Sequence, residues 1–494
     1  MNDLELNTAL LDEVGRDICI RCRTYPVALE SNALIFASAN IHDEILREAL
    51  QLRSGRAVEF RKADGPTLEY QIKRISGKAG ALEAGGILSD LIKSEVAIQE
   101  GSSIEEIKKK SQSEPVIKLV NNLVNQAIAE IATDIHIEPG ENLVKVRYRK
   151  DGMLKDSMEL PKWVQPSFTS RIKILAELDI AEKRIPQDGR IKWLHEGEYI
   201  DMRVSTLPTR VGEKVVIRIL KHMDHVDSME ALGMSPEVLT SMNQLIHRPQ
   251  GMLFVTGPTG SGKSSTLYAS LRAILEKDIN VSTIEDPIEY RLEGANQVQI
   301  NEKAGLTFAS ALRSLLRQDP DVIMVGEIRD EETAGIAVQA AQTGHLVFST
   351  LHTNDAASAI TRLQDLKVKP FLISSAVLGV LSQRLVRCLC PACFTMSPPT
   401  AEEKVFLPML PDLCPTAVGC PACNGTGYRG RTGIFELLLF DTAIREAIIG
   451  GKSESQIKKL SGYQQLVMDG MDKLRRNVTS AGELIRVAVM EAQT

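Results

Sequence analysis

Gly257 to Ser264 carry the clearest chemistry in this 494-residue chain. The letters GPTGSGKS satisfy G-x-x-x-x-G-K-[ST], a phosphate-binding P-loop, between an apolar run at 252–255 and a helix-compatible run at 265–271. Glycines let the backbone curl so that its N–H groups point at phosphate oxygens, and the helix N-terminus adds partial positive charge. We expect Lys263 to reach the β- and γ-phosphates and Ser264 to bind Mg²⁺. The predicted nucleotide-binding residues are Gly257, Pro258, Thr259, Gly260, Ser261, Gly262, Lys263, Ser264 and Ser265.

Acidic residues follow two other apolar runs, at strand ends where α/β sheets bind ligands. Glu327 ends the run 321–327, and Gly326 stands where P-loop enzymes usually carry a first acidic residue. We predict that Glu327 polarises or positions the attacking water, the alternative being a surface glutamate. A second group of carboxylates consists of Glu285, Asp286 and Glu289. We expect these residues to hold Mg²⁺ through water or to share in base catalysis, the alternative being an ordinary acidic turn.

Two histidines bracket the apolar run 346–351. His345 and His352 are seven residues apart, so on a strand they point to opposite faces and cannot readily share a metal. We expect the one at the strand end near the nucleotide to sense the γ-phosphate, and the alternative for each is a structural histidine.

Five arginines are expected to stabilise the transferring phosphoryl group, because the guanidinium fork matches phosphate geometry. Arg313, Arg317 and Arg329 flank the carboxylates, whereas Arg203 and Arg218 belong to a different predicted domain. The latter pair would close over a nucleotide held by the P-loop domain. Ion pairs with local acidic residues are the alternative for all five.

The sequence Cys-Pro-Ala-Cys occurs twice, at 390–393 and at 420–423. Two C-x-x-C pairs are typical of tetrahedral thiolate ligation of structural zinc, whereas redox activity needs only one pair. We therefore predict zinc ligands at Cys390, Cys393, Cys420 and Cys423. Cys388 and Cys414 are expected to lie outside the set, the alternative being that either competes as a ligand. The pair Cys19 and Cys22 has the same spacing but no second pair nearby, which favours ordinary thiols.

Buried parallel strands are expected to position the P-loop and the carboxylates. Apolar runs at 252–256, 281–284, 322–325 and 346–350 alternate with helical stretches, as in an α/β core. The predicted division is a small N-terminal domain at 1–93, a linker at 94–114, an α+β second domain at 115–228, the P-loop core at 229–385, a cysteine segment at 386–430 and a helical region at 431–494.

Composition limits the remaining possibilities. Hydrophobic residues make up 43% and charged residues 25%, as in globular proteins, and no apolar stretch approaches the roughly 18 residues that span a bilayer. The first residues lack the features of a signal peptide, so we expect a cytoplasmic protein. A net charge of −6 and 4% aromatic residues give no basic or stacking footprint for nucleic acid, and no nucleic-acid partner is expected.

Several motifs in order resemble the secretion-type traffic ATPases, which include type II secretion and type IV pilus ATPases and DNA-transfer relatives. They are GPTGSGKS, TIEDPIEY, LRQDPDVIMVGEIRD and TGHLVFSTLHTN, preceded by IAEKRIPQDGR at 180–190 and MRVSTLPT at 202–209. The likeness covers about 115–494. It implies a RecA-like core, a hexameric ring, and ATP bound between the second domain and the P-loop domain. It places Glu327 in the Walker B position, the acidic box at 285–289, the histidine box at His345 and His352, and functional arginines at the five positions above.

Within that family the paired cysteines and the run 427–433 resemble assembly rather than retraction ATPases, and 370–393 is most similar to the type II secretion member. The resemblance implies a motor for pseudopilus assembly, peripheral at the inner membrane through partners. These would be a polytopic platform protein and, through residues 1–93, the cytoplasmic domain of another inner-membrane protein. The first 93 residues match only loosely. A type IV pilus assembly motor is the closest alternative, followed by a nucleic-acid translocase or a nucleotide-gated scaffold.

Overall fold

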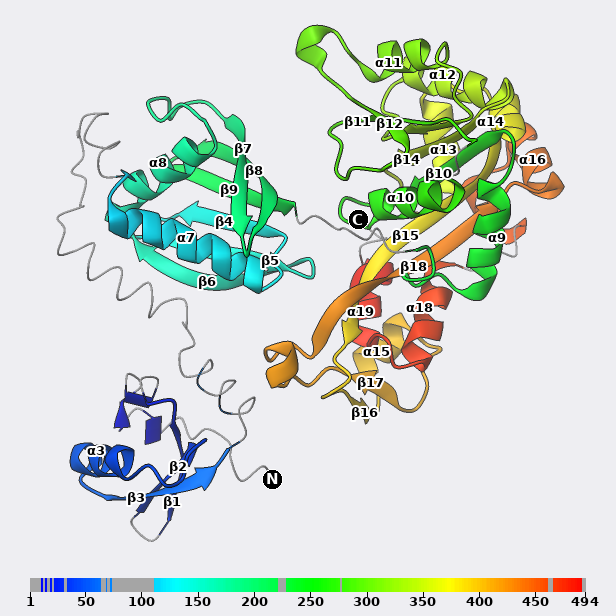
Figure 1. The fold of residues 1–494 in the computed structure, drawn as a ribbon. Coiled ribbons are helices and arrows are strands. Elements are labelled where there is room, and N and C mark those ends of the chain that lie inside the picture. Colours follow the sequence, from blue (N-terminus) through cyan, green and yellow to red (C-terminus); the bar gives the residue numbers. More distant parts are fainter. Residues whose placement is uncertain are drawn as a thin grey trace. The chain divides into compact units, whose positions relative to one another are not determined.

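The computed structural model describes residues 111–220, 228–275, 278–460 and 465–490, together with 10, 11, 14, 15, 18, 19, 22–30, 33–63, 68 and 72. The chain divides into two compact units. Figure 1 shows the helices and strands within them. One comprises Met1–His222 and Gly419–Gly425, and the other comprises Met223–Val418 and Thr426–Thr494. Residues 94–110 of the expected linker lie outside the described residues.

The N-terminal part of the first unit contains a small sheet of β1 (Tyr25–Glu30), β2 (Ala33–Ser38) and β3 (Ala57–Lys62) beside helix α3 (Glu44–Ser54). Every residue of β2 is buried, and α3 begins where the Asp43 side chain accepts a hydrogen bond from the Leu46 N–H.

A second sheet in this unit has six antiparallel strands in the order β6-β5-β4-β9-β8-β7. Buried and half-exposed residues alternate along β5, as its sequence predicts, so that one face of the sheet is apolar. That face forms a core with α7 and α8. The elements are α7 (Glu114–Ala129), β4 (Asp134–Pro139), β5 (Leu143–Lys150), β6 (Met153–Pro161), η1 (Lys162–Val164), α8 (Gln165–Leu175), β7 (Gln187–His195), β8 (Glu198–Thr209) and β9 (Gly212–Leu220).

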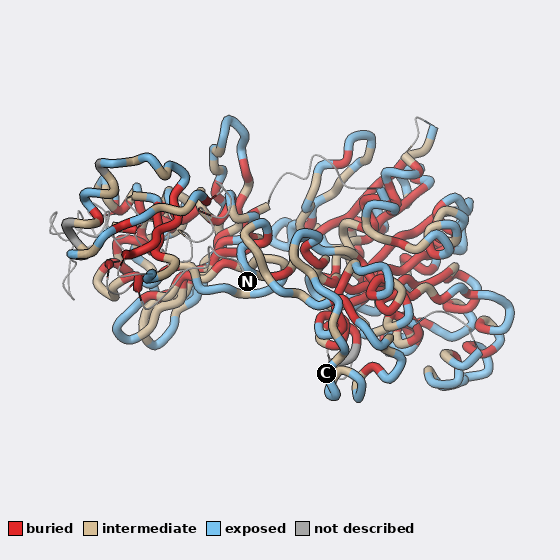
Figure 2. Tube along the Cα trace, turned by 90° about the horizontal axis from the view of Figure 1, so that it is seen from below, coloured by how far each residue is buried: buried red, intermediate tan, exposed pale blue. Residues whose placement is uncertain are grey.

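The second unit is built on a seven-stranded sheet in the order β12-β11-β13-β14-β10-β15-β18. All neighbouring strands are parallel except the pair β15 and β18. The four strands predicted from apolar runs are present and fully buried, as expected for a parallel sheet covered on both faces. Figure 2 shows in red the buried residues along the chain. The strands are β10 (Gly251–Thr256), β11 (Val281–Glu285), β12 (Ala295–Gln299), β13 (Val322–Val325), β14 (Leu346–Leu351), β15 (Val377–Leu389) and β18 (Tyr428–Leu439).

Helices cover both faces of this sheet. Alternate residues of β10 enter two different cores: Met252 and Phe254 pack with α11, α12 and α14, whereas Leu253 and Val255 pack with α9 and α10. The three layers confirm the α/β core. These elements are α9 (Pro236–Ile246), α10 (Lys263–Ile274), η2 (Glu302–Ala304), α11 (Phe308–Leu315), α12 (Glu331–Gln342), α13 (Ser358–Asp365) and α14 (Pro370–Ala376).

Both expected boundaries of the cysteine segment, at residues 386 and 430, fall inside strands. β15 continues past residue 385, and β18 begins before residue 431 and pairs with β15 from Gly379↔Leu439 to Leu389↔Tyr428. The region 431–494 therefore starts as an edge strand of the core sheet, and its helices follow. The remaining elements are β16 (Thr395–Ser397), α15 (Ala401–Phe406), β17 (Cys414–Thr416), η3 (Pro421–Cys423), α16 (Thr442–Ile449), α17 (Glu454–Leu460), α18 (Leu466–Arg475), α19 (Ala481–Leu484) and η4 (Ile485–Met490).

Among the described residues, every helix is too short or too polar to cross a bilayer.

Candidate functional site

The P-loop joins the end of β10 to the start of α10, as its motif predicts. Gly257 and Gly262 adopt φ values of 145° and 88°, which L side chains rarely tolerate. Space also requires glycine here: a Cβ on Gly257 would lie 2.3 Å from the Gln383 carbonyl oxygen, and one on Gly262 would lie 2.7 Å from Gln383 Nε2. The loop is therefore packed tightly on β15.

Gln383 is a residue of this site that the sequence argument missed. It is 1% exposed on β15, and its Oε1 accepts a hydrogen bond of 2.6 Å from Thr266 Oγ1 in the first turns of α10. Together with its contacts to the two glycines, this bond fixes the loop and the helix to the sheet. A polar residue inside the apolar run of β15 was the available signal.

Lys263 lies within the curl of the loop. Its Nζ donates hydrogen bonds to the carbonyl oxygens of Gly257, at 2.9 Å, and Pro258, at 3.0 Å. Burial lowers the pKa of Lys263 to about 8, against the opposing attraction of Glu327 and Glu289. Nearby, Ser261 Oγ is buried without a hydrogen-bond partner. A cation and a polar atom in need of a partner fit the phosphate group of a nucleotide.

Nucleotide affinity is expected to fall as pH rises through the pKa of Lys263. Phosphate favours the ammonium form, and a pKa of about 8 leaves Lys263 mostly protonated at pH 7 and mostly neutral at pH 9. Because the apparent Kd rises as the competent fraction falls, we expect the Kd for MgADP to increase about tenfold between these two values. Calorimetric titration measures it. Lys263→Arg stays charged and should flatten the profile; an equally flat wild-type profile would contradict the assignment.

Glu327 follows the end of β13, which is separated from β10 by β14 in the sheet order. Its Oε1 lies 2.5 Å from the Arg329 guanidinium, and its Oε2 lies 3.8 Å from His352 Nε2. The pKa of His352 is lowered, first by burial and then by the positive charge of Lys263. Lys263, Glu327, Arg329 and His352 thus form one electrostatic cluster at the carboxyl edge of the sheet.

His345 lies at the other edge of the sheet. β14 runs parallel to β10 with Gly251 opposite Leu346 and Thr256 opposite Leu351, so the residue before β14 lies far from the loop that follows β10. At about 3.3 Å per residue, the strand separates His345 from His352 by about 20 Å. His345 Nδ1 contacts the Ala340 carbonyl oxygen at 3.0 Å. Of the two histidines, only His352 is therefore placed to sense a γ-phosphate.

The acidic box divides into a buried and an exposed part. Glu285 is 4% exposed, and its carboxylate accepts hydrogen bonds from Tyr268 Oη at 2.5 Å and Thr283 Oγ1 at 2.6 Å. Asp286 and Glu289 are exposed. Because Tyr268 belongs to α10, Glu285 ties the P-loop helix to β11. Its oxygens are thereby engaged within the protein, which leaves Asp286 and Glu289 as the better candidates for a water-mediated magnesium contact.

The segment after His352 is fastened to the C-terminal part of the same unit. Asp355 Oδ2 lies 2.5 Å from Lys458 Nζ of α17, and the buried Glu436 of β18 accepts the Ala356 N–H at 2.9 Å and the Leu466 N–H at 3.2 Å. Burial raises the pKa of Glu436. A hollow of about 480 Å³ opens beside this segment. These contacts hold the backbone that carries His352.

The five predicted arginines lie in three places. Arg329 pairs with Glu327, as described above. Arg313 pairs with Glu332, and Arg317 donates to the Arg313 carbonyl oxygen at 2.8 Å, so both are held by local contacts of α11 and α12. Arg203 and Arg218 belong to the first unit, where they lie directly opposite each other on β8 and β9.

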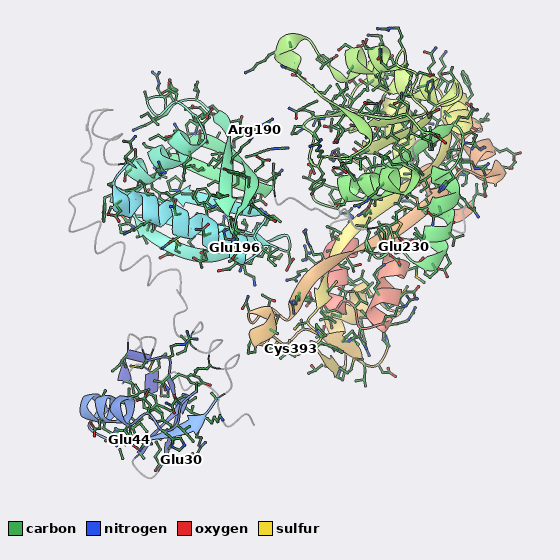
Figure 3. All side chains as sticks on the ribbon, in the orientation of Figure 1. Glu30, Glu44, Arg190, Glu196, Glu230 and Cys393 are labelled. Carbon is green, nitrogen blue, oxygen red and sulfur yellow. The ribbon has the colours of Figure 1, made fainter. Side chains whose placement is uncertain are left out.

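The four predicted cysteine ligands come together. One ligand atom from each of Cys390, Cys393, Cys420 and Cys423 lies within 4.8 Å of the others, and Figure 3 labels Cys393. The Sγ atoms of Cys420 and Cys423 are 3.8 Å apart. Tetrahedral zinc with bonds of about 2.3 Å requires sulfur atoms about 3.8 Å apart, so the donor set and its spacing fit the metal.

Comparison with known proteins decides the family. A family model described as type II/IV secretion system protein matches residues 109–486. The chain is 50% identical to the type II secretion system protein E of Aeromonas hydrophila over 380 residues, 76% of this chain and 75% of that protein. The chain belongs to this family of secretion ATPases.

Other members extend the likeness. The type IV pilus assembly ATPase PilB of Thermus thermophilus is 43% identical over 479 residues, which are 95% of this chain but 53% of PilB. In three dimensions the chain is similar to the pilus retraction motor PilT with bound ADP, with a TM-score of 0.51 and 28% identity over 75% of this chain and 95% of that chain. The family, its fold and the cluster at the P-loop agree on an ATP-hydrolysing enzyme.

Proposed function

We propose that this protein is the motor ATPase that powers pseudopilus assembly for type II protein secretion. The observation that carries ATP hydrolysis is the cluster of Lys263, Glu327 and His352 at the carboxyl edge of the core sheet, where Glu327 lies 3.8 Å from His352. The link to secretion rests on the 50% identity with the type II secretion system protein E of A. hydrophila.

Each residue has a defined task in this proposal. The P-loop backbone and Lys263 bind the phosphates of ATP, and Ser264 holds Mg²⁺, which neutralises charge on the β- and γ-phosphates. Glu327 orients the attacking water and His352 senses the γ-phosphate. Arg203 and Arg218 complete the phosphate contacts, with Arg329, Arg313 and Arg317 acting at the subunit boundary.

The second metal of the proposal is zinc. Cys390, Cys393, Cys420 and Cys423 would hold it, and the 3.8 Å sulfur separation of Cys420 and Cys423 supports this assignment. Zinc would supply folding energy to the segment between the two cysteine pairs rather than chemistry, because all four positions of a Cys₄ site are taken by protein ligands.

The proposed assembly is a homo-hexamer in the cytoplasm, peripheral at the inner membrane through protein partners. Residues 1–93 would dock on the cytoplasmic domain of one inner-membrane protein of the secretion platform, and the ring would act on a second, polytopic one. Arginines that serve a nucleotide across a subunit boundary are common in ring ATPases, which supports an oligomer here. No nucleic-acid partner is proposed, in keeping with the net charge of −6.

Assembly of a type IV pilus is the second candidate, and one observation favours it. The match to Thermus PilB extends over 95% of the chain, whereas the match to the A. hydrophila protein covers 76%. The PilB match therefore includes most of the N-terminal region, the part expected to choose the membrane partner.

A chromosomal Glu327→Gln replacement tests the two candidates. If the proposal holds, the cells should retain normally exported enzymes in the periplasm while their surface pili remain unchanged. Loss of pili with normal export would overturn the secretion assignment in favour of pilus assembly. Complementation with the wild-type chain is the control.

A further inference from the structure

Five charged residues form a row across one face of the six-stranded sheet in the first unit. The strand register places Arg149 opposite Asp134, Asp134 opposite Arg218, Arg218 opposite Arg203, and Arg203 opposite Arg190. Residues directly opposite each other in antiparallel strands point to the same face, with Cβ atoms about 4.5–5.5 Å apart. Figure 3 labels Arg190 at the β7 end of this row. Four positive charges and one negative charge therefore share the face.

Such a row costs stability, because like charges directly opposite each other repel. Arg218 lies opposite Arg203, and Arg203 lies opposite Arg190. An anionic ligand would offset this repulsion. The proposed contact of Arg203 and Arg218 with the phosphates of ATP is consistent with that requirement.

Asp134 is the only carboxylate in the row, and it is 6% exposed. Its Oδ1 accepts a hydrogen bond of 3.0 Å from Arg218 Nε, and its Oδ2 accepts one of 2.8 Å from Thr133 Oγ1 and lies 3.7 Å from Arg149 Nε. The Arg218 side chain remains 58% exposed. A buried, well-bonded carboxylate thus holds an exposed guanidinium by its Nε.

This contact determines which edge of Arg218 faces outward. When a guanidinium donates to a carboxylate from Nε, its terminal Nη1 and Nη2 groups face away from that carboxylate. These two groups form the fork that binds phosphate in a bidentate manner. Without the carboxylate, the long arginine side chain would sample many rotamers, and ordering it on ligand binding would carry an entropic cost.

We propose that Asp134 is a positioning residue for ATP hydrolysis: it holds the guanidinium of Arg218 so that its terminal fork meets the nucleotide phosphates. The inference rests on the phosphate contact assigned to Arg218 under the proposed function. Asp134 touches neither nucleotide nor water in this scheme and acts only through the arginine.

Glu138 offers a matched control on the same strand and the same face. It lies 2.6 Å from Arg147 and 3.0 Å from Lys214, so it too is a carboxylate between two cations of neighbouring strands. Among the described residues, its ion-pair partners are these two cations and His136, rather than Arg218, Arg203 or Arg190. Removing Glu138 therefore removes a comparable ion-pair network without releasing Arg218.

The test is a double-mutant cycle on the full-length chain, with steady-state ATPase kinetics and thermal melting. We expect Arg218→Ala to lower kcat about 1,000-fold, the lower end of the effect of an arginine finger. Asp134→Ala should lower kcat about 10- to 100-fold, the cost of misplacing a group by roughly 1 Å, with a smaller change in KM. The double variant should be no slower than Arg218→Ala alone, because no guanidinium remains to be positioned. Glu138→Ala should keep kcat within about twofold, as expected for a partly exposed ion pair.

Three results would overturn the inference. Multiplicative losses in the double variant would mean that Asp134 acts independently of Arg218. A wild-type kcat in Asp134→Ala would mean that Asp134 does not position Arg218, and a wild-type kcat in Arg218→Ala would mean that Arg218 does not act in hydrolysis. The Glu327→Gln enzyme separately tests whether the protein hydrolyses ATP as proposed. If Asp134→Ala does not fold, the cycle is run with Asp134→Asn, which keeps Oδ1 as an acceptor. Its kcat should be about threefold lower than that of the wild type, and this loss should disappear when Arg218 is also replaced.

Discussion

Replacing Glu327 with glutamine is expected to lower kcat for ATP hydrolysis at least about 100-fold while nucleotide binding persists. The carboxylate lies 3.8 Å from His352 and 2.5 Å from Arg329, at the sheet edge that holds Lys263. Glutamine keeps the size and one acceptor oxygen but cannot take up a proton or polarise water as a carboxylate does. Phosphate release and MgATP titration measure the two effects separately.

Glu331→Gln is the matched control for this variant. Glu331 lies four residues further along the chain and is exposed in the first turn of α12. Its substitution should leave kcat within about twofold, since exposed surface positions contribute little. A Glu327→Gln enzyme that turns over at the wild-type rate would refute the assignment of Glu327 to the attacking water.

Loss of the proposed zinc is expected to produce the second large effect, on stability rather than rate. Cys423→Ser removes one of four sulfur ligands that lie within 4.8 Å of one another, and metal binding at such a site contributes directly to folding. A loss of roughly 3 kcal/mol corresponds to a Tm about 10 °C lower for a domain of this size. Elemental analysis should find one zinc per wild-type chain and little in the variant.

Cys388→Ser is the control that separates the loss of a zinc ligand from the loss of any nearby cysteine. Cys388 lies two residues before the cluster but outside it, so its variant should retain zinc and the wild-type Tm. Incubation with a strong chelator should lower the wild-type Tm by about as much as Cys423→Ser. Protein purified without chelator that contains no zinc would refute the metal assignment.

The P-loop and the four strands around it were predictable from the sequence because their signals are local. A short apolar run such as 322–325 can be buried on both faces only within a covered sheet, and the glycine spacing of 257–262 specifies a backbone conformation residue by residue. The cysteine cluster was predictable for the same reason, since C-x-x-C spacing defines each half of the site locally.

The role of a residue that depends on a partner far away in the chain could not be predicted from local sequence patterns. Gln383 meets the P-loop only because β15 pairs with β10, more than a hundred residues earlier in the chain. Residues 431–439 were expected to belong to a helical region, but they lie in β18, which extends the core sheet by pairing with β15. No local sequence pattern in 431–439 predicts this pairing. Asp134 meets Arg218 through a strand pairing of the same long-range kind.

By itself, the sequence predicted a nucleotide site at Lys263 and brought four cysteines into one candidate metal site, because both patterns depend on short, rigid spacings. Only the tertiary structure showed that His352 and His345 lie at opposite edges of the sheet, that Glu285 is buried against Tyr268, and that Asp134 lies opposite Arg218. Two physical causes account for this: the packing of strands and helices joins residues that are far apart in the chain, and the length of a strand carries the residues at its two ends to opposite edges of a sheet.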